Sequence, residues 1–182
     1  MMRVPSGFTF LLGGARSGKS HLAVRMGQAW AGAVTLVATA DVRGDDDLAA
    51  RVARHRADRP VAWRVVEEPH DLANAVRSVE PHQLLIVDCI TLWVGRLCSD
   101  GASLDAVGAA ADELATFLAE RADPSVVVSN EVGLGVHPPT ALGREFCDAL
   151  GHANQRLARR ADRALLLVAG RAVPLRDVEE LW

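Results

Sequence analysis

A glycine-rich stretch near the start of the chain ends in a lysine and a serine. It reads Gly13-Gly14-Ala15-Arg16-Ser17-Gly18-Lys19-Ser20. The spacing fits the P-loop pattern G-x-x-x-x-G-K-[ST], in which glycines let backbone N–H groups point at a phosphate. Lys19 is expected to reach the β- and γ-phosphates of a nucleotide, and the Ser20 hydroxyl to bind Mg²⁺. The alternative is a glycine turn with a solvated lysine, which the strand before it and the helix after it argue against.

An aspartate stands where a P-loop protein needs a second acidic group for the metal. Asp88 ends the apolar run 84–87, the usual place for that carboxylate. It could instead cap the following helix, but the apolar run behind it favours the metal role. Arg16, inside the loop, either contacts phosphate oxygens or is solvated. These residues predict binding of a nucleoside triphosphate, which defines a class of protein and not yet a function.

The elements that position these residues alternate along the chain. Strands are expected at 8–12, 34–38, 63–66, 84–87, 125–128 and 164–168. Helices are expected at 20–30, 45–57, 72–79, 104–121 and 143–160. Near-continuous apolar strands separated by helices predict an α/β fold with a mostly parallel sheet covered on both faces.

The composition of the chain further limits the class of protein to which it can belong. With 182 residues, of which 49% are hydrophobic, the chain is long enough for one compact domain with a sizeable core. The net charge of −3 argues against a positively charged surface that would bind nucleic acid. Three cysteines without metal-ligand spacing indicate a reducing compartment. We expect a cytoplasmic protein, because no apolar run approaches the ~18 residues of a membrane span and the N-terminus is unlike a signal peptide.

Five further strings accompany the P-loop. In chain order they are 37–40; 51–60, followed by Trp63 and 67–69; 88–93; 129–135; and 154–158. Together with the P-loop they closely resemble the bifunctional adenosylcobinamide kinase / adenosylcobinamide-phosphate guanylyltransferase family of cobalamin biosynthesis. The resemblance runs from about Leu11 to Leu175. The P-loop alone would be weakly specific, but the set of strings is highly specific.

This resemblance implies two reactions. A nucleoside triphosphate, ATP or GTP, phosphorylates the hydroxyl of adenosylcobinamide, and GTP then donates GMP to the adenosylcobinamide phosphate with release of pyrophosphate. The family passes GMP through a covalent histidine adduct, and His55 occupies that position. Family members also have a RecA-like fold and assemble as homotrimers.

The chemistry expected of His55 is physically reasonable. Neutral imidazole is a good nucleophile near neutral pH. On a helix, Arg51 and Arg59 would share its face, where guanidinium groups could hold phosphates and keep the histidine neutral. Without the resemblance, a histidine on a basic helix is more often a surface residue, and that is how we interpret the other five histidines.

Other residues match positions at which the family contacts the nucleotide. The expected residues are Thr39, Ala40, Asp41, Arg56, Ala57, Asp58, Arg59 and Glu67. Each could equally be a helix cap or a surface charge. Asn130 and Glu131 end a buried strand beside the P-loop edge and are candidates for orienting the cobinamide hydroxyl or its phosphate. Asn154 could serve helix packing just as well.

Some positions depart from the family pattern, among them Arg96, where an asparagine is expected. None of these departures removes a phosphate-handling group. Two other functions fit the P-loop. A single-function P-loop kinase for another small alcohol would have no use for His55. A nucleotide-gated switch would hydrolyse slowly and transfer nothing to a small molecule.

Overall fold

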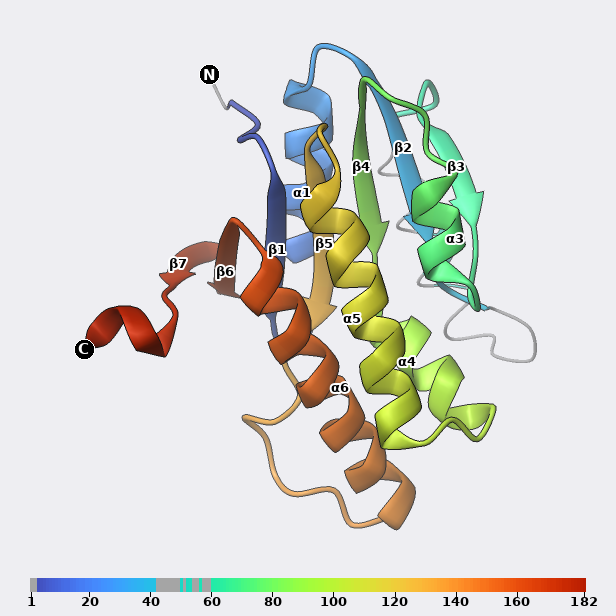
Figure 1. Ribbon diagram of the computed structural model, residues 1–182, viewed down its shortest axis with the longest axis vertical. Helices are drawn as coiled ribbons and strands as arrows, with labels where there is room; N and C mark the ends of the chain where they lie inside the picture. Colours follow the sequence, from blue (N-terminus) through green and yellow to red (C-terminus); the bar gives the residue numbers. More distant parts are fainter. Residues whose placement is uncertain (1–2, 42–49, 51, 54–55, 57–59) are drawn as a thin grey trace.

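The computed structural model describes residues 3–41, 50, 52–53, 56 and 60–182. The described strands form one seven-stranded sheet in the order β3-β2-β4-β5-β1-β6-β7 (Figure 1). Neighbouring strands run parallel except for β6 and β7, which pair antiparallel. The strands are β1 (Phe8–Gly13), β2 (Ala33–Ala38), β3 (Arg64–Glu67), β4 (Gln83–Asp88), β5 (Ser125–Asn130), β6 (Arg163–Val168) and β7 (Arg171–Leu175).

Helices cover both faces of the sheet. The described helices are α1 (Lys19–Ala29), α3 (Leu72–Arg77), α4 (Ile90–Ser99), α5 (Leu104–Glu120), α6 (Ala141–Arg160) and the 3-10 turn η1 (Val178–Leu181). Helices α3 to α6 pack on one face, and α1 packs on the other against β1, β4 and β5. The chain ends in β7 and η1, which extend away from the helical layers (Figure 1). No described helix has the length and apolar character needed to cross a membrane.

The two faces of the sheet build two separate cores. Because successive side chains of a strand point to opposite faces, Val126 and Val128 of β5 join the core under α1. Val127, between them, joins the core under α4, α5 and α6. The same alternation places Ile86 of β4 under α1 and Val87 on the other side. The direction of a side chain at a strand end therefore follows from its place in this alternation.

The predicted parallel α/β fold is confirmed, with differences in its elements. Helix α6 begins at Ala141, two residues earlier than expected, because the Thr140 hydroxyl caps it by accepting from the Gly143 N–H at 3.1 Å. Helix α4 and strand β7 were not predicted from the sequence. Every residue of β7 is exposed, so this strand lacks the apolar pattern that marks the others. Of the helix expected over 45–57, residues 50, 52, 53 and 56 are described and are helical, and the others lie outside the described residues.

Candidate nucleotide-binding site

The P-loop connects β1 to α1, as its sequence predicted. Gly13 has φ +153°, and a Cβ there would lie 2.4 Å from the carbonyl oxygen of Leu167. Gly18 has φ +104° and caps the N-terminus of α1, a conformation that side chains disfavour. The β6–β7 turn supports the loop from outside, since the Gly170 N–H donates to the Ser17 carbonyl at 2.9 Å. Two glycines of the motif are thus required by the backbone path itself.

Lys19 lies inside the loop and is 6% exposed. Its Nζ donates to the carbonyl oxygens of Gly13 and Gly14, both at 2.7 Å, and to Ser17 Oγ at 3.4 Å. Burial lowers the pKa of Lys19, while the nearby Cys89 and Asp88 act in the opposite direction. The ammonium group is therefore held by backbone oxygens that phosphate oxygens can replace.

Ser20 and Asp88 face each other at the carboxyl edge of the sheet. The Ser20 hydroxyl donates to Asp88 Oδ1 at 3.4 Å. Adjacent ligands of an octahedral Mg²⁺ lie about 3 Å apart, so the two oxygens fit one ion or an ion and its bound water. Among the described residues, no group of three or more His, Cys, Asp or Glu side chains could hold a metal. A Mg²⁺ here would draw its other ligands from phosphates and water, as this ion prefers.

Thr39 binds the chain directly after Asp88. It is 1% exposed, its hydroxyl donates to the Cys89 carbonyl at 2.6 Å, and the Cys89 N–H donates back to it at 3.0 Å. Burial raises the pKa of the Cys89 thiol to about 11, so the thiol is neutral at physiological pH. The Thr39 side chain thus fixes the end of β2 against the end of β4.

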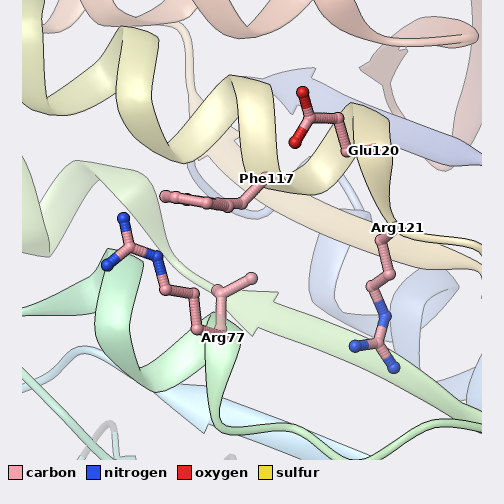
Figure 2. A pocket seen from close by; sticks show the side chains of 5 residues that line it. Arg77, Phe117, Glu120 and Arg121 are labelled. Atoms are coloured by element: carbon pink, nitrogen blue, oxygen red, sulfur yellow. The ribbon is translucent and has the colours of Figure 1, made fainter.

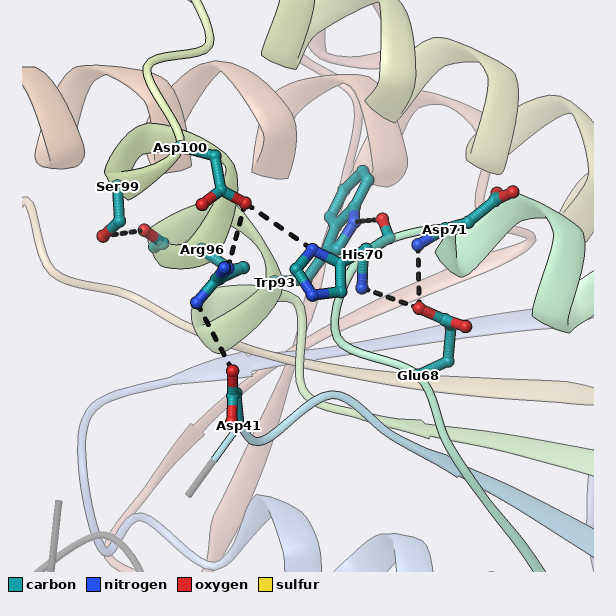
Figure 3. Close-up of polar contacts among 9 residues, drawn as sticks. Asp41, Glu68, His70, Asp71, Trp93, Arg96, Ser99 and Asp100 are labelled. Atoms are coloured by element: carbon teal, nitrogen blue, oxygen red, sulfur yellow. Dashed lines mark hydrogen bonds and ion pairs between the residues drawn. The ribbon is translucent and has the colours of Figure 1, made fainter. Parts of the chain in front are cut away.

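A polar network continues from β2 onto α4 (Figure 3). Arg96 on α4 contacts Asp41 at 3.3 Å through Nη1 and Asp100 at 2.9 Å through Nε. His70 Nδ1 lies 3.5 Å from the same Asp100 carboxylate, and the Trp93 indole N–H donates to the His70 carbonyl at 2.9 Å. The arginine that departs from the family pattern therefore joins the end of β2 to α4 and to the loop after β3.

Of the remaining residues expected to bind nucleotide, some are described by the structure and others are not. Arg56 and Glu67 form an ion pair on the surface, so two of them are brought together at the β3 edge. Ala40 and Asp41 follow β2 directly. His55, Ala57, Asp58 and Arg59 lie outside the described residues. Arg16 is exposed and has φ +59°. Thr91 accepts from the Asn130 N–H at 2.8 Å, a contact that was not predicted because nothing in the sequence pairs these two positions.

One surface pocket lies away from these residues (Figure 2). It is lined by Val76, Arg77, Phe117, Glu120 and Arg121. Arg77 stacks on the Phe117 ring, 3.8 Å from its centroid. These residues belong to the last turns of α3 and α5 and the segments after them, which lead into the amino ends of β4 and β5. The pocket is thus at the edge of the sheet opposite the P-loop.

Known proteins are similar to this chain in sequence and in fold. Residues 9–175 match the family described as cobinamide kinase / cobinamide phosphate guanyltransferase. A bifunctional adenosylcobalamin biosynthesis protein, CobP of Pseudomonas aeruginosa, is 44% identical, covering 91% of this chain and 95% of the relative. A bifunctional adenosylcobalamin biosynthesis protein of Escherichia coli, CobU, is 34% identical, covering 90% and 97%.

Solved structures agree on the fold. The flagellar accessory protein FlaH from Methanocaldococcus jannaschii superposes with a TM-score of 0.54 at 12% identity, covering 95% of this chain and 80% of that one. The RadB recombinase superposes with a TM-score of 0.52 at 17% identity, covering 88% and 73%. At these identities the likeness concerns the fold alone, and it confirms the RecA-like P-loop architecture.

Proposed function

This chain belongs to the cobinamide kinase / cobinamide phosphate guanyltransferase family, and we propose that both reactions take place at the carboxyl edge of its sheet. The first activity phosphorylates the hydroxyl of adenosylcobinamide. The second transfers GMP from GTP to the adenosylcobinamide phosphate and releases pyrophosphate. Both belong to cobalamin biosynthesis, the process named for its relatives.

The arrangement of Lys19, Ser20 and Asp88 is the observation that carries this proposal. Lys19 lies buried in the loop, and its ammonium group donates to two backbone carbonyl oxygens that phosphate oxygens can replace. The Ser20 hydroxyl lies 3.4 Å from Asp88 Oδ1. Lys19 binds the phosphate oxygens and stabilises the charge that develops on the leaving phosphates. Ser20 and Asp88 would hold Mg²⁺, which would neutralise phosphate charge.

The guanylyl transfer uses His55 as nucleophile. A ring nitrogen of His55 attacks the α-phosphorus of GTP, the bond from that phosphorus to the bridging oxygen breaks, and pyrophosphate leaves with the electron pair. A phosphate oxygen of the second substrate then attacks the same phosphorus and breaks the N–P bond, which restores the imidazole. Lys19 offsets the charge of the departing pyrophosphate.

The order of the strands supports one site for both reactions. Along the carboxyl edge, the P-loop after β1 comes first, then β5, then Asp88 at the end of β4, and then the ends of β2 and β3. Thr39, Ala40 and Asp41 follow β2, and Glu67 with Arg56 stands at β3. We assign the guanine nucleoside to this side and the phosphates to the P-loop, where Arg16 lies. Ala57, Asp58 and Arg59 are guanine-nucleotide contacts by the family resemblance. The triphosphate then extends from this side towards the P-loop.

Assembly and location complete the proposal. The 182 residues act as one domain, use ATP or GTP as phosphoryl donor and work in the cytoplasm as a homotrimer. Exposed apolar side chains near the C-terminus support self-association: Val168, Val173, Val178 and Trp182.

Covalent labelling tests the guanylyl transfer. The protein is incubated with α-³²P-GTP and Mg²⁺ in the absence of cobinamide, beside His55→Ala and His21→Ala. His21 is a matched control because it is exposed and follows Ser20 directly on α1. We expect an acid-labile, alkali-stable label on the wild type and on His21→Ala, and none on His55→Ala. Adenosylcobinamide phosphate should then remove the label.

Other outcomes would overturn parts of this proposal. A label that persists on His55→Ala and disappears from His21→Ala would assign the nucleophile to α1. If no protein is labelled while γ-phosphate transfer to an alcohol continues, the chain is a single-function P-loop kinase. A wild type that only hydrolyses nucleotide slowly would indicate a nucleotide-gated switch.

A further inference from the structure

The last residue of β5 lies between the two parts of the phosphate site. Strand β5 is flanked by β1, which leads into the P-loop, and by β4, which ends in Asp88. Asn130 pairs in register with Gly13, the first residue of the P-loop, while Asp88 pairs with Val128. Asn130 therefore stands two residues beyond Asp88, or about 6.6 Å further along the strand direction.

The alternation of side chains shows to which face Asn130 belongs. Val126 and Val128 lie in the core under α1, so Asn130, two residues further along the same strand, points to the α1 face. Asp88 follows Ile86 by the same rule and indeed contacts Ser20 of α1. Asn130 thus shares its face of the sheet with Lys19 and Ser20, which open α1.

Two side chains hold the backbone of Asn130 in place. The Asn130 N–H donates to Thr91 Oγ1 at 2.8 Å, and its carbonyl oxygen accepts from Asn154 Nδ2 at 3.0 Å. Because β4 ends two residues earlier, these side chains satisfy backbone groups that have no strand partner on that side. Asn154 is 6% exposed and its Oδ1 accepts from the Ser129 hydroxyl at 2.6 Å, which fixes its amide orientation.

The side chain of Asn130 is half-buried and makes no hydrogen bond within the described part of the chain. An amide has both an acceptor oxygen and an N–H₂ donor, so it can contact a hydroxyl and a phosphoryl oxygen at once. Asn130 stands beside Gly13 and beyond Asp88, at the edge of the sheet where the proposed function puts the terminal phosphate and its acceptor. Rigidity at this point matters because small misplacements of reacting groups cost large factors in rate.

We propose that Asn130 is a catalytic residue of the phosphorylation step, which bridges the acceptor hydroxyl and the γ-phosphoryl group, and that Thr91 and Asn154 are positioning residues which hold it there. The inference rests on the proposed function. In this step the hydroxyl oxygen bonds to the γ-phosphorus and the bond from that phosphorus to the β,γ-bridging oxygen breaks. The nucleoside diphosphate leaves with the electron pair, and the hydroxyl proton passes to water.

The two activities of one protein provide the test. Formation of the GMP–histidine adduct needs no acceptor hydroxyl and involves the α-phosphorus, so it should not depend on Asn130. We expect Asn130→Ala to lower kcat for cobinamide phosphorylation about 100-fold. The KM for nucleotide and the rate of labelling by α-³²P-GTP should stay within about threefold.

Substitutions at Thr91 separate positioning from folding. Thr91→Val removes the oxygen that accepts from Asn130 and keeps the shape, whereas Thr91→Ser keeps the oxygen. We expect kcat for phosphorylation to fall about tenfold in Thr91→Val and less than twofold in Thr91→Ser. Thr116→Val is the remote control, because this hydroxyl bonds only within the exposed side of α5. It should leave both activities unchanged.

Each of the following results would overturn a part of this proposal. Phosphorylation by Asn130→Ala within threefold of the wild type would refute the catalytic role. A parallel loss of phosphorylation and labelling in Asn130→Ala would assign the residue to nucleotide binding instead. Equal activities of Thr91→Val and Thr91→Ser would refute the positioning role. A wild type that phosphorylates no cobinamide would overturn the proposed function and this inference with it.

Discussion

The metal site proposed for Ser20 and Asp88 can be tested with a double-mutant cycle on these two residues. The perturbations are Ser20→Ala, Asp88→Asn and the two together. Their side-chain oxygens lie 3.4 Å apart, close to the roughly 3 Å between adjacent ligands of one Mg²⁺. If both act through the same ion, removal of either side chain removes the same stabilisation, and the second substitution has little left to remove.

The magnitudes follow from transition-state energetics. We expect each single substitution to lower kcat for phosphorylation about 100-fold, equivalent to about 2.7 kcal/mol. Independent residues would then give a loss of about 10⁴-fold in the double variant. A shared ion predicts a double variant within about tenfold of the weaker single one, which corresponds to a coupling of about 1.4 to 2.7 kcal/mol.

The assay is initial-rate phosphorylation of cobinamide across a Mg²⁺ titration. Both single variants should need more Mg²⁺ for half-maximal activity, and by similar factors. Their thermal unfolding serves as the control. The lost hydrogen bond is partly exposed and contributes at most about 1 kcal/mol, so Tm should fall by no more than about 4 °C. A double variant that loses the full 10⁴-fold would refute a common ion.

Three further predictions concern buried groups. Burial lowers the pKa of Lys19 below its ordinary 10.5, so the affinity for nucleotide should fall at a lower pH than it would with an ordinary lysine. Equilibrium binding of GTP between pH 7 and 10.5 measures this, and an affinity that stays constant over this range would contradict it. Since burial raises the pKa of Cys89 from 9.0 to about 11, its alkylation by iodoacetamide at pH 8 should be at least about 100-fold slower in the folded protein than in urea, as followed by peptide mass spectrometry. Leu118→Ala should lower the free energy of unfolding in urea by about 2 to 5 kcal/mol, because Leu118 is 1% exposed, while Thr116→Ala on the same helix should change it by less than about 0.5 kcal/mol.

The P-loop and Asp88 could be predicted from the sequence because each of them is marked by a local pattern. The P-loop spans eight consecutive positions, and Asp88 ends an apolar run that reads as a strand. Strands β1, β4 and β5 are buried on both faces, so their apolar runs are continuous and easy to recognise.

Other features depend on contacts that local sequence does not encode. Strand β7 is exposed throughout and, among the described strands, pairs only with β6, so neither apolar alternation nor burial marks it. Asn154 lies 24 residues from Asn130, and Thr91 lies 39 residues from it. Only the packing of α4 and α6 against β5 brings these side chains to the same backbone. From the sequence, Asn154 could serve helix packing equally well.

The turn after β4 connects the two sides of the proposed site. On one side, the backbone of Cys89 is bound twice by Thr39 at the end of β2, with hydrogen bonds of 2.6 and 3.0 Å. On the other side, Thr91 binds Asn130 at the end of β5 at 2.8 Å. Residues 88–91 thus connect the side assigned to the guanine nucleoside with the side assigned to the acceptor hydroxyl.

These links have an energetic consequence. If the strand ends moved independently, binding at β2 would leave the acceptor side free, and each reaction would bear its own entropy cost of ordering. Because one short turn is hydrogen-bonded to both neighbours, fixing the end of β4 orders the edge from β2 to β5. Substitutions that weaken the Thr39 link should therefore slow both reactions, whereas Thr91→Val should slow phosphorylation alone.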